Sequence, residues 1–245
     1  MIEGPEAQSL ENDIGQIAAG NIPNGWQVVP SSPHARVYRH AGKAAYFKEF
    51  LPRSQFDIVK SWLRGDRSIR ARLRSVQLAE LGFNTPRPLA WGLFKRHRGF
   101  LVTEGVAAIG VTDWLRGEQA ADTGKRRKLL LALGDVIGCL HRSGIVHGDL
   151  RTSNVLVANN SPTFTFYFID NERNSRYPEI PLKLVKKNLV QLDMLPPADL
   201  SRSDRLRFLY SYFVSYGRFS ASEQRELIGA VHTRALQRLA AKGLV

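Results

Sequence analysis

The sequence predicts an α+β protein of two lobes, with a β-rich N-terminal lobe that contains one main helix and a mostly helical C-terminal lobe. Hydrophobic residues alternate with polar ones over short runs in the N-terminal part, and they recur at helical spacing in most of the rest. The chain has 245 residues, 43% of them hydrophobic, which is enough to fill a core. We therefore expect lobes at residues 23–105 and 106–245, after an N-terminal tail over residues 1–22 for which disorder is one expectation.

The N-terminal lobe is expected to hold five short strands and one basic helix. The strand segments are separated by glycine, proline and other turn residues. The helix is expected to end at Gly82, because glycine commonly follows the last residue of a helix. In chain order, the predicted elements cover residues 26–29, 35–40, 43–50, 67–82, 84–94 and 98–105.

The C-terminal lobe is predicted to be helical except for one pair of strands. Its longest helix carries Leu133, Ile137 and Leu140 at helical spacing. Helices are expected at residues 111–117, 123–144, 181–192, 201–215 and 220–240, and the strand pair at residues 155–158 and 163–170.

A polar loop at residues 147–154 lies between the longest helix and the strand pair. Its spacing, H-x-D-L-x-x-x-N, matches a kinase catalytic loop. Phosphoryl transfer needs a carboxylate to orient the attacking hydroxyl and oxygen ligands for Mg²⁺. We therefore expect Asp149 to be the catalytic base and Asn154 to bind Mg²⁺ through its carbonyl oxygen. His147 and Arg151 are candidates for supporting roles.

Further candidates occur on both sides of this loop, in the order found in kinases. Lys48 lies on a predicted strand, where a cation would neutralise the phosphates of ATP. Asp170 ends an apolar strand and would reach the Mg²⁺ that bridges those phosphates. The run that ends at Glu104 is typical of a hinge, in which the backbone from Glu104 to Val106 would hydrogen-bond adenine. Together these residues predict a protein-kinase-like fold that uses ATP and Mg²⁺.

Two parts of the kinase pattern are missing. The turn between the first strands contains no glycine, so the serines at 31–32 would have to donate hydroxyls to the phosphates. No acid stands near Ala71 or Arg72, where the helix glutamate that pairs with the strand lysine is expected. What orients Lys48 is therefore open: it could pair with Asp170 or with an acid from elsewhere, and a chain of low or absent activity is a further alternative.

Several segments of the chain resemble one family, the Kdo/WaaP lipopolysaccharide kinases, which are small bacterial kinase-like enzymes that phosphorylate inner-core sugars. The resemblance extends over about residues 31–212. The catalytic loop alone is shared with aminoglycoside and choline kinases, whereas the T-P-R-P turn and the last two segments favour this family. The segments that carry it are residues 82–92, 100–105, 147–157, 168–173, 187–192 and 201–209.

The resemblance implies a Kdo or heptose hydroxyl as acceptor, on sugars attached to lipid A, and it gives Lys48, Asp149, Asn154 and Asp170 the roles stated above. Transfer would occur at the cytoplasmic face of the inner membrane, with the chain bound peripherally to the anionic surface. The formal charge of +13 fits an anionic partner. No apolar run approaches the length of a membrane span, and the N-terminus lacks the apolar region of a signal peptide, so we expect a cytoplasmic protein.

Two groups of basic residues are expected either to face anionic lipid or to be solvated. The helix group is Arg64, Arg67, Arg70, Arg72 and Arg74, and the C-terminal group is Lys183, Lys186, Lys187, Arg202, Arg205 and Arg207.

Three alternative functions remain open at this stage. A kinase-like small-molecule phosphotransferase with a cationic acceptor would need an acceptor pocket with several acids, and the C-terminal lobe after Asp170 is instead basic. A pseudokinase binding module fits the missing helix glutamate, although Asp149, Asn154 and Asp170 are all retained. Nucleic-acid binding fits the charge but lacks a recognised motif, so nucleic acid is disfavoured as a partner. The oligomeric state is not predicted.

Overall fold

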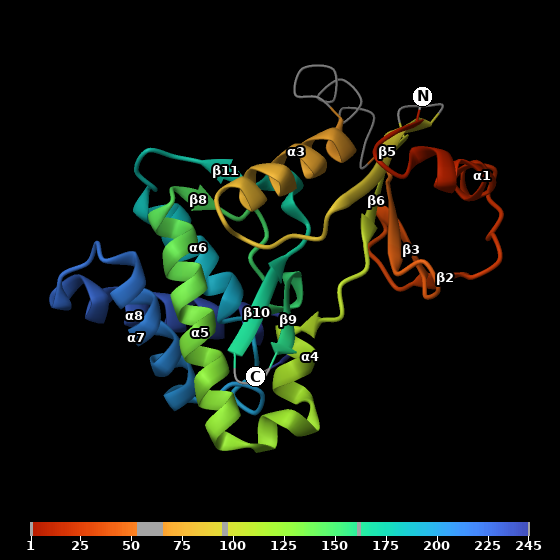
Figure 1. Cartoon of the computed structure of the whole chain (residues 1–245). Helices are drawn as coiled ribbons and strands as arrows, with labels where there is room; N and C mark the ends of the chain where they lie inside the picture. The colour runs from red at the N-terminus through yellow and green to blue at the C-terminus, as the bar shows by residue number, and fades with distance from the viewer. Residues whose placement is uncertain (1, 53–65, 95–97, 161–162, 245) are drawn as a thin grey trace. The chain divides into compact units, whose positions relative to one another are not determined.

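The computed structural model describes residues 2–52, 66–94, 98–160 and 163–244 (Figure 1). The chain divides into two compact units, residues 1–107 and 108–245. The first is rich in strands and the second in helices, which confirms the α+β class expected from the sequence. None of the described helices is long and apolar enough to cross a membrane.

The N-terminal unit is built on one antiparallel sheet with the strand order β1-β5-β6-β4-β3-β2. Its central strand β4 places Lys48 opposite Val37 of β3 and Leu101 of β6. All five strands expected from the sequence are present. The bounds are β1 Ile2–Glu3, β2 Trp26–Val29, β3 Ala35–His40, β4 Ala45–Phe50, β5 Pro88–Phe94 and β6 Arg98–Glu104.

The two faces of this sheet have different cores, because successive side chains of a strand point to opposite faces. On β4, Ala45 and Phe47 belong to a large cluster that includes the helix α1 (Ala7–Ala18). Phe50 packs on the other face in a smaller cluster with Ala71 of α3 (Arg67–Glu80). Lys48 alternates with Phe47, so it lies on the face covered by α3.

The N-terminal segment, for which disorder was one expectation, contains a strand and a helix within the described residues 2–22. Strand β1 extends the sheet by pairing with β5, and α1 buries Leu10, Ile14 and Ile17 in the larger core cluster. These residues recur at i, i+4 and i+7, so one face of α1 is apolar and contacts the sheet. The N-terminal segment is therefore part of the first unit.

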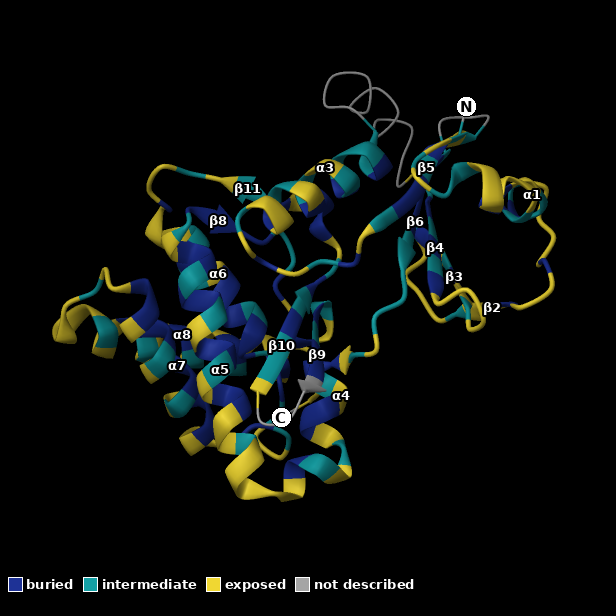
Figure 2. Ribbon diagram, viewed as in Figure 1, coloured by how far each residue is buried: buried dark blue, intermediate teal, exposed yellow. Residues whose placement is uncertain are grey.

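The C-terminal unit combines small antiparallel sheets with long helices. One sheet has the order β10-β9-β7 and the other pairs β11 with β8. Buried and exposed residues alternate around α5 and α6, as expected for amphipathic helices (Figure 2). The strands are β7 Ile109–Gly110, β8 Ile145–Val146, β9 Val155–Asn160, β10 Thr163–Phe168 and β11 Ser175–Arg176. The helices are α4 Val111–Arg116, α5 Thr123–Arg142, α6 Leu182–Leu192, α7 Arg202–Tyr216 and α8 Ala221–Ala240.

Helices α5 and α7 pack closely because two glycines of α5 face the backbone of α7. A Cβ at Gly138 would lie 2.7 Å from the carbonyl oxygen of Tyr212, and one at Gly134 would meet the carbonyl oxygen of Phe208. Larger residues at these positions would force the helices apart. The close packing holds α7 against α5. Helix α5 is the last helix before the polar loop at residues 147–154.

Candidate active site

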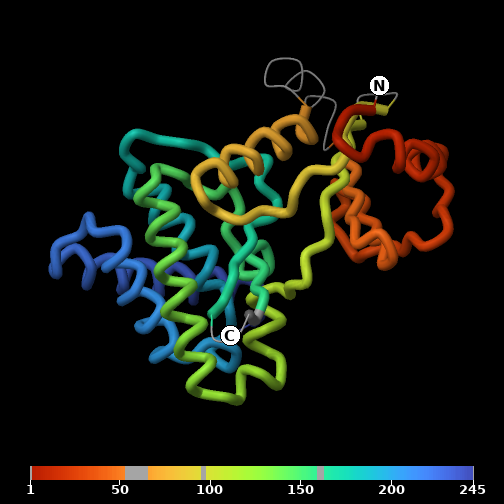
Figure 3. Tube along the Cα trace, viewed as in Figure 1, coloured from red at the N-terminus to blue at the C-terminus, as the bar shows by residue number. Residues whose placement is uncertain are grey.

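The loop at residues 147–154 connects β8 to β9 (Figure 3). His147, its first residue, is completely buried. Its Nδ1 accepts the backbone N–H of Asp149 at 3.2 Å, so its Nε2 carries the proton and donates to the carbonyl of Ile169 at 3.0 Å. Burial lowers the pKa of His147, which keeps this ring neutral. The neutral ring of His147 therefore links the loop to the segment before Asp170 through two hydrogen bonds.

The carboxylate of Asp149 receives two side-chain hydrogen bonds, both on Oδ1. Arg151 donates from Nε at 3.0 Å, and Gln191 of α6 donates from Nε2 at 3.1 Å. The Asp149 side chain remains 31% exposed. An oriented and accessible carboxylate of this kind can accept a proton from a bound hydroxyl.

Asn154 and Asp170 lie beside paired residues of β9 and β10. Val155, which follows Asn154, pairs with Phe168, and the N–H of Ile169 donates to the carbonyl of Asn154 at 3.1 Å. The side chain of Asn154 donates from Nδ2 to the carbonyl of Asp149 at 2.9 Å, which leaves its Oδ1 as the available ligand atom. Two oxygen-bearing side chains thus project from neighbouring strand ends, in a pattern that suits Mg²⁺.

Asp170 is one of two non-glycine residues in the described part of the chain that have a positive φ. Its φ of 62° and ψ of 40° lie in the left-handed region, which aspartate and asparagine tolerate better than most residues. The residue is exposed and directly precedes a short 3₁₀ helix, Asn171–Arg173. Strained backbone of this kind often occurs at functional sites.

Gly148 lets the segment after Asp170 approach the catalytic loop. A Cβ there would collide with the Cβ of Arg173 and lie 2.6 Å from the carbonyl oxygen of Arg173. The N–H of Gly148 donates to Oδ1 of Asn174 at 3.2 Å, and Asn174 donates to Asn171 at 3.0 Å. This explains the glycine between His147 and Asp149 by close backbone contact.

Helix α6 holds the loop through the side chains of two residues to which the sequence analysis assigned no role. Asn188 is completely buried and bonds both the N–H and the carbonyl of His147. Gln191, one turn later, bonds Leu150 and Asp149. Two polar residues three apart on the apolar face of a helix are a signal that could have identified them.

The other candidates lie in the N-terminal unit. Lys48 is on β4 with its Nζ 5.1 Å from the centre of the Phe50 ring. At the end of β6, Glu104 binds Arg87 through both backbone and carboxylate, and Gly105 donates its N–H to Ala44. The N–H of Val106 makes no hydrogen bond within the described residues, so it can donate to a ligand. The hinge role of Val106 stays a prediction.

One expectation about phosphate contacts changes with the structure, and the absence of a helix acid for Lys48 does not. The hydroxyl of Ser31 donates to the carbonyl of Ala35 at 2.9 Å, so it is already used in a turn. On α3, Ala71 is buried against the sheet, and Arg72 lies over the ring of Trp91 at 4.3 Å. Neither the helix position nor its neighbour supplies an acid for Lys48.

The helix group of arginines does not form the exposed basic face expected from the sequence. None of the four described members is fully exposed, and Arg67 bonds the carbonyls of His34 and Leu51. The exposed side of α3 instead carries the apolar residues Leu73 and Val76. Arg64 lies outside the described residues.

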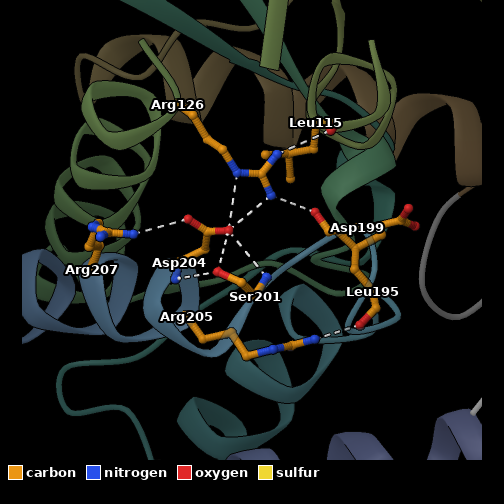
Figure 4. A network of polar contacts seen from close by, with 8 residues as sticks. All are labelled: Leu115, Arg126, Leu195, Asp199, Ser201, Asp204, Arg205 and Arg207. Atoms are coloured by element: carbon orange, nitrogen blue, oxygen red, sulfur yellow. Dashed lines mark hydrogen bonds and ion pairs between the residues drawn. The ribbon is translucent and has the colours of Figure 1, made fainter. Parts of the chain in front are cut away.

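Part of the C-terminal basic group is also structural (Figure 4). Arg205 is buried and binds Asp193 and the carbonyl of Leu195, so it neither faces lipid nor is solvated. Asp204 accepts from Arg126 at 3.0 Å and caps α7 together with Ser201. The prediction for Arg205 is wrong because a sequence shows a charge but not its partner across the fold.

Comparisons with known proteins found a matching family and several similar proteins. The model of the lipopolysaccharide kinase (Kdo/WaaP) family matches residues 31–212. The lipopolysaccharide core heptose(I) kinase WaaP of Pseudomonas aeruginosa is 28% identical over 151 residues, 56% of this chain and 56% of that protein. The EKC/KEOPS complex subunit bud32 of Aspergillus oryzae is 35% identical over 65 residues, 26% of this chain and 22% of that protein. The matches thus span from about a fifth to just over half of these relatives.

Solved structures share the fold over more of the chain. The structure of WaaP in complex with acyl carrier protein aligns with 97% of this chain and 98% of that one, with a TM-score of 0.65 and 20% identity. A crystal structure of WbdD aligns with 85% of this chain and 50% of that one, with a TM-score of 0.51 and 21% identity. At these identities the likeness shows the fold alone, and it confirms the kinase-like fold class expected from the sequence.

Proposed function

The chain belongs to the lipopolysaccharide kinase (Kdo/WaaP) family, and on that premise we propose that it transfers a phosphoryl group from ATP to a sugar hydroxyl of the lipopolysaccharide inner core. The observation that supports this most directly is the loop at residues 147–154, where an oriented carboxylate and an amide oxygen lie beside Asp170. Those are the groups that phosphoryl transfer requires.

Asp149 is the proposed base. As the acceptor oxygen forms a bond to the γ-phosphorus, its proton passes to Asp149, and the bond from that phosphorus to the bridging oxygen breaks to release ADP. Arg151, which bonds Asp149 and is 61% exposed, adds positive charge next to the transferred group. His147 keeps the loop in place through its two hydrogen bonds.

Asn154 and Asp170 are the proposed Mg²⁺ ligands. No cluster of three or more His, Cys, Asp or Glu residues able to hold a metal occurs in the described part of the chain. Two side-chain ligands completed by phosphate oxygens and water are typical of Mg²⁺ in kinases. When bound, Mg²⁺ neutralises the phosphate oxygens of ATP. Lys48 is proposed to contact the same phosphates, and Glu104 and Val106 to bind adenine through their backbone.

The acceptor we propose is a Kdo or heptose unit on a lipid A anchor, in line with the heptose kinase named among the relatives. This acceptor places the chain at the cytoplasmic face of the inner membrane as a peripheral protein. The net charge of +13 supports binding to an anionic surface.

The test is transfer of labelled phosphate from ATP, with Mg²⁺, to lipid A that carries core sugars. Aminoglycoside, a generic protein and buffer without acceptor serve as control acceptors, and an Asp149→Asn variant serves as control enzyme. We expect label only on the lipopolysaccharide acceptor and only with the unmodified chain. Transfer to the aminoglycoside instead would indicate a small-molecule kinase. A thermal shift with ATP and Mg²⁺ but no transfer to any acceptor would indicate a binding module.

A further inference from the structure

A chain of side-chain hydrogen bonds runs from Tyr212 on α7 to the carboxylate of Asp149. Its members come from three helices, α7, α5 and α6, and it ends in the catalytic loop. Tyr212, His141 and Asn188 are almost completely buried, so these bonds form in a medium of low polarity. Buried polar groups of this kind are costly unless they are satisfied.

The backbone fixes which way the amide of Asn188 points. Its Oδ1 accepts the N–H of His147 at 3.1 Å, and its Nδ2 donates to the carbonyl of His147 at 2.7 Å. A backbone N–H can only donate and a carbonyl can only accept, so the two amide atoms of Asn188 are assigned without ambiguity.

This assignment determines the orientation of Gln191. Nδ2 of Asn188 also donates to Oε1 of Gln191 at 3.1 Å, and the same oxygen accepts the N–H of Leu150 at 3.3 Å. Nε2 of Gln191 is therefore the atom that faces Asp149, and it donates to Oδ1 at 3.1 Å. Both bonds to Oε1 hold the amide against rotation.

The same assignment extends in the other direction to Tyr212. Oδ1 of Asn188 lies 3.2 Å from Nε2 of His141, which must donate, so Nδ1 of that ring accepts the Tyr212 hydroxyl at 2.9 Å. Burial lowers the pKa of His141 to about 4, which leaves the ring neutral with a single N–H. All four bonds thus run in one sense, from the phenol to the carboxylate, and each polarises the next.

We propose that Gln191 is a positioning residue for phosphoryl transfer, which holds Oδ1 of Asp149 through the hydrogen-bond chain that starts at Tyr212 and so presents Oδ2 to the acceptor hydroxyl. This inference rests on the proposed role of Asp149 as the base. Arg151 also bonds Oδ1, but its side chain is 61% exposed and its bond competes with water. Gln191 is only partly exposed and is held from two sides.

The test uses three variants, placed at the two ends of the hydrogen-bond chain. Gln191→Glu keeps the acceptor for Leu150 and Asn188 but replaces the donor to Asp149 with an oxygen. Gln191→Met keeps the volume without polar atoms, and Tyr212→Phe keeps the ring and removes the first donor. We expect kcat to fall about 10- to 100-fold for both Gln191 variants and by a smaller factor for Tyr212→Phe, with KM for ATP changed less than about twofold.

The matched control is Gln237→Glu on α8, where the exposed glutamine side chain accepts a hydrogen bond from Arg234. It should keep the kcat of the unmodified chain. If the role of Gln191 were only structural, its variants would have a lower melting temperature and a smaller active fraction. The molecules that stay folded would then keep the kcat of the unmodified chain. Full kcat in Gln191→Glu, with Asp149→Asn inactive, would overturn the positioning role and leave the proposed function intact.

A second measurement does not depend on activity. Urea unfolding of Gln191→Met, Asp149→Ala and the double variant forms a double-mutant cycle, because alanine removes the oxygen that accepts the Gln191 amide. We expect non-additive changes in stability, because both substitutions remove the same hydrogen bond. Additive changes would overturn the inference by showing that the two side chains do not interact. Absence of transfer in the unmodified chain would instead overturn the proposed function.

Discussion

Asn154 donates its side-chain amide to the backbone carbonyl of Asp149 at 2.9 Å, so one hydrogen bond joins the two residues whose spacing first indicated a kinase. The bond determines which atom of Asn154 is left for a metal. It also fixes the backbone of Asp149 relative to that atom. The proposed base and the proposed Mg²⁺ ligand therefore share one rigid loop.

Replacement of Asp149 by asparagine tests the base directly. The substitution keeps the shape of the side chain but removes its ability to accept a proton, so we expect kcat to fall about 10²- to 10⁴-fold. Circular dichroism and melting temperature should stay close to those of the unmodified chain. Asp113→Asn, at an exposed position in the first turn of α4, is the matched control and should retain activity. Near-normal turnover in Asp149→Asn would disprove the role of base.

Asp170 can be tested separately for charge and for backbone conformation. Asp170→Asn and Asp170→Gly both tolerate a φ of 62°, so both variants should fold with little change in melting temperature. Both lack the carboxylate, so we expect the thermal shift produced by ATP and Mg²⁺ to disappear together with phosphate transfer. If either variant kept the Mg²⁺-dependent shift, Asp170 would not be a metal ligand.

Features that depend on nearby residues in the chain were predictable from the sequence. The periodicity of the strands and helices and the spacing within residues 147–154 are local, so the α+β class and the loop could both be identified. The amphipathic helix at residues 7–18 carried the same kind of signal in Leu10, Ile14 and Ile17, and its packing on the sheet was still missed. Local patterns are therefore informative only when they are searched for in every segment.

Features that depend on pairing across the fold were not predictable. Gln191 is 42 residues from the carboxylate it bonds, and no local pattern joins the two. Arg205 looked like a surface cation because its partners, Asp193 and Leu195, come from the segment before α7. Arg67 likewise bonds carbonyls that sequence spacing cannot place near it. The tertiary structure decides which charges are exposed.

Lys48→Met is expected to impair ATP binding selectively. Methionine keeps an apolar stem beside Phe50 but loses the charge, and a hydrogen bond to a charged group contributes about 1.5–3 kcal/mol. We therefore expect KM for ATP to rise about 10- to 100-fold with a stable fold. Lys128→Met, at an exposed position of α5, is the control. Unchanged KM and kcat in Lys48→Met would show that another cation binds the phosphates.

Because His141 is buried, we expect the free energy of unfolding to fall in mild acid. Its pKa is about 4 when folded and 6.5 in the unfolded chain, because burial disfavours the charged ring. Between these values the unfolded state binds more protons, so the free energy of unfolding is highest above pH 6.5 and falls as the pH drops towards 4. The full loss is about 3 kcal/mol for this residue alone, and His147, whose pKa is also lowered by burial, adds to it.

Urea unfolding at pH 5 and pH 7.5 measures this loss. The comparison is with His141→Gln, which retains hydrogen-bonding groups but does not titrate. The variant should be less stable at pH 7.5, and its stability should change less between the two pH values. An equal pH dependence in the two proteins would show that His141 is not the responsible group.

Two glycine-to-alanine substitutions should have opposite effects on stability. At Gly148 the added Cβ meets the side chain and backbone of Arg173, and the backbone cannot move away without breaking the bond from Gly148 to Asn174. We expect a loss of about 1–3 kcal/mol in the free energy of unfolding, as for overpacking in a core. At Gly229, inside α8, nothing lies within 4 Å of the added Cβ, so the chain should gain about 0.5–1 kcal/mol from the higher helix propensity of alanine. Chemical denaturation of both variants measures the difference, and a Gly148→Ala protein as stable as Gly229→Ala would show that the loop and the segment at Arg173 do not pack this closely.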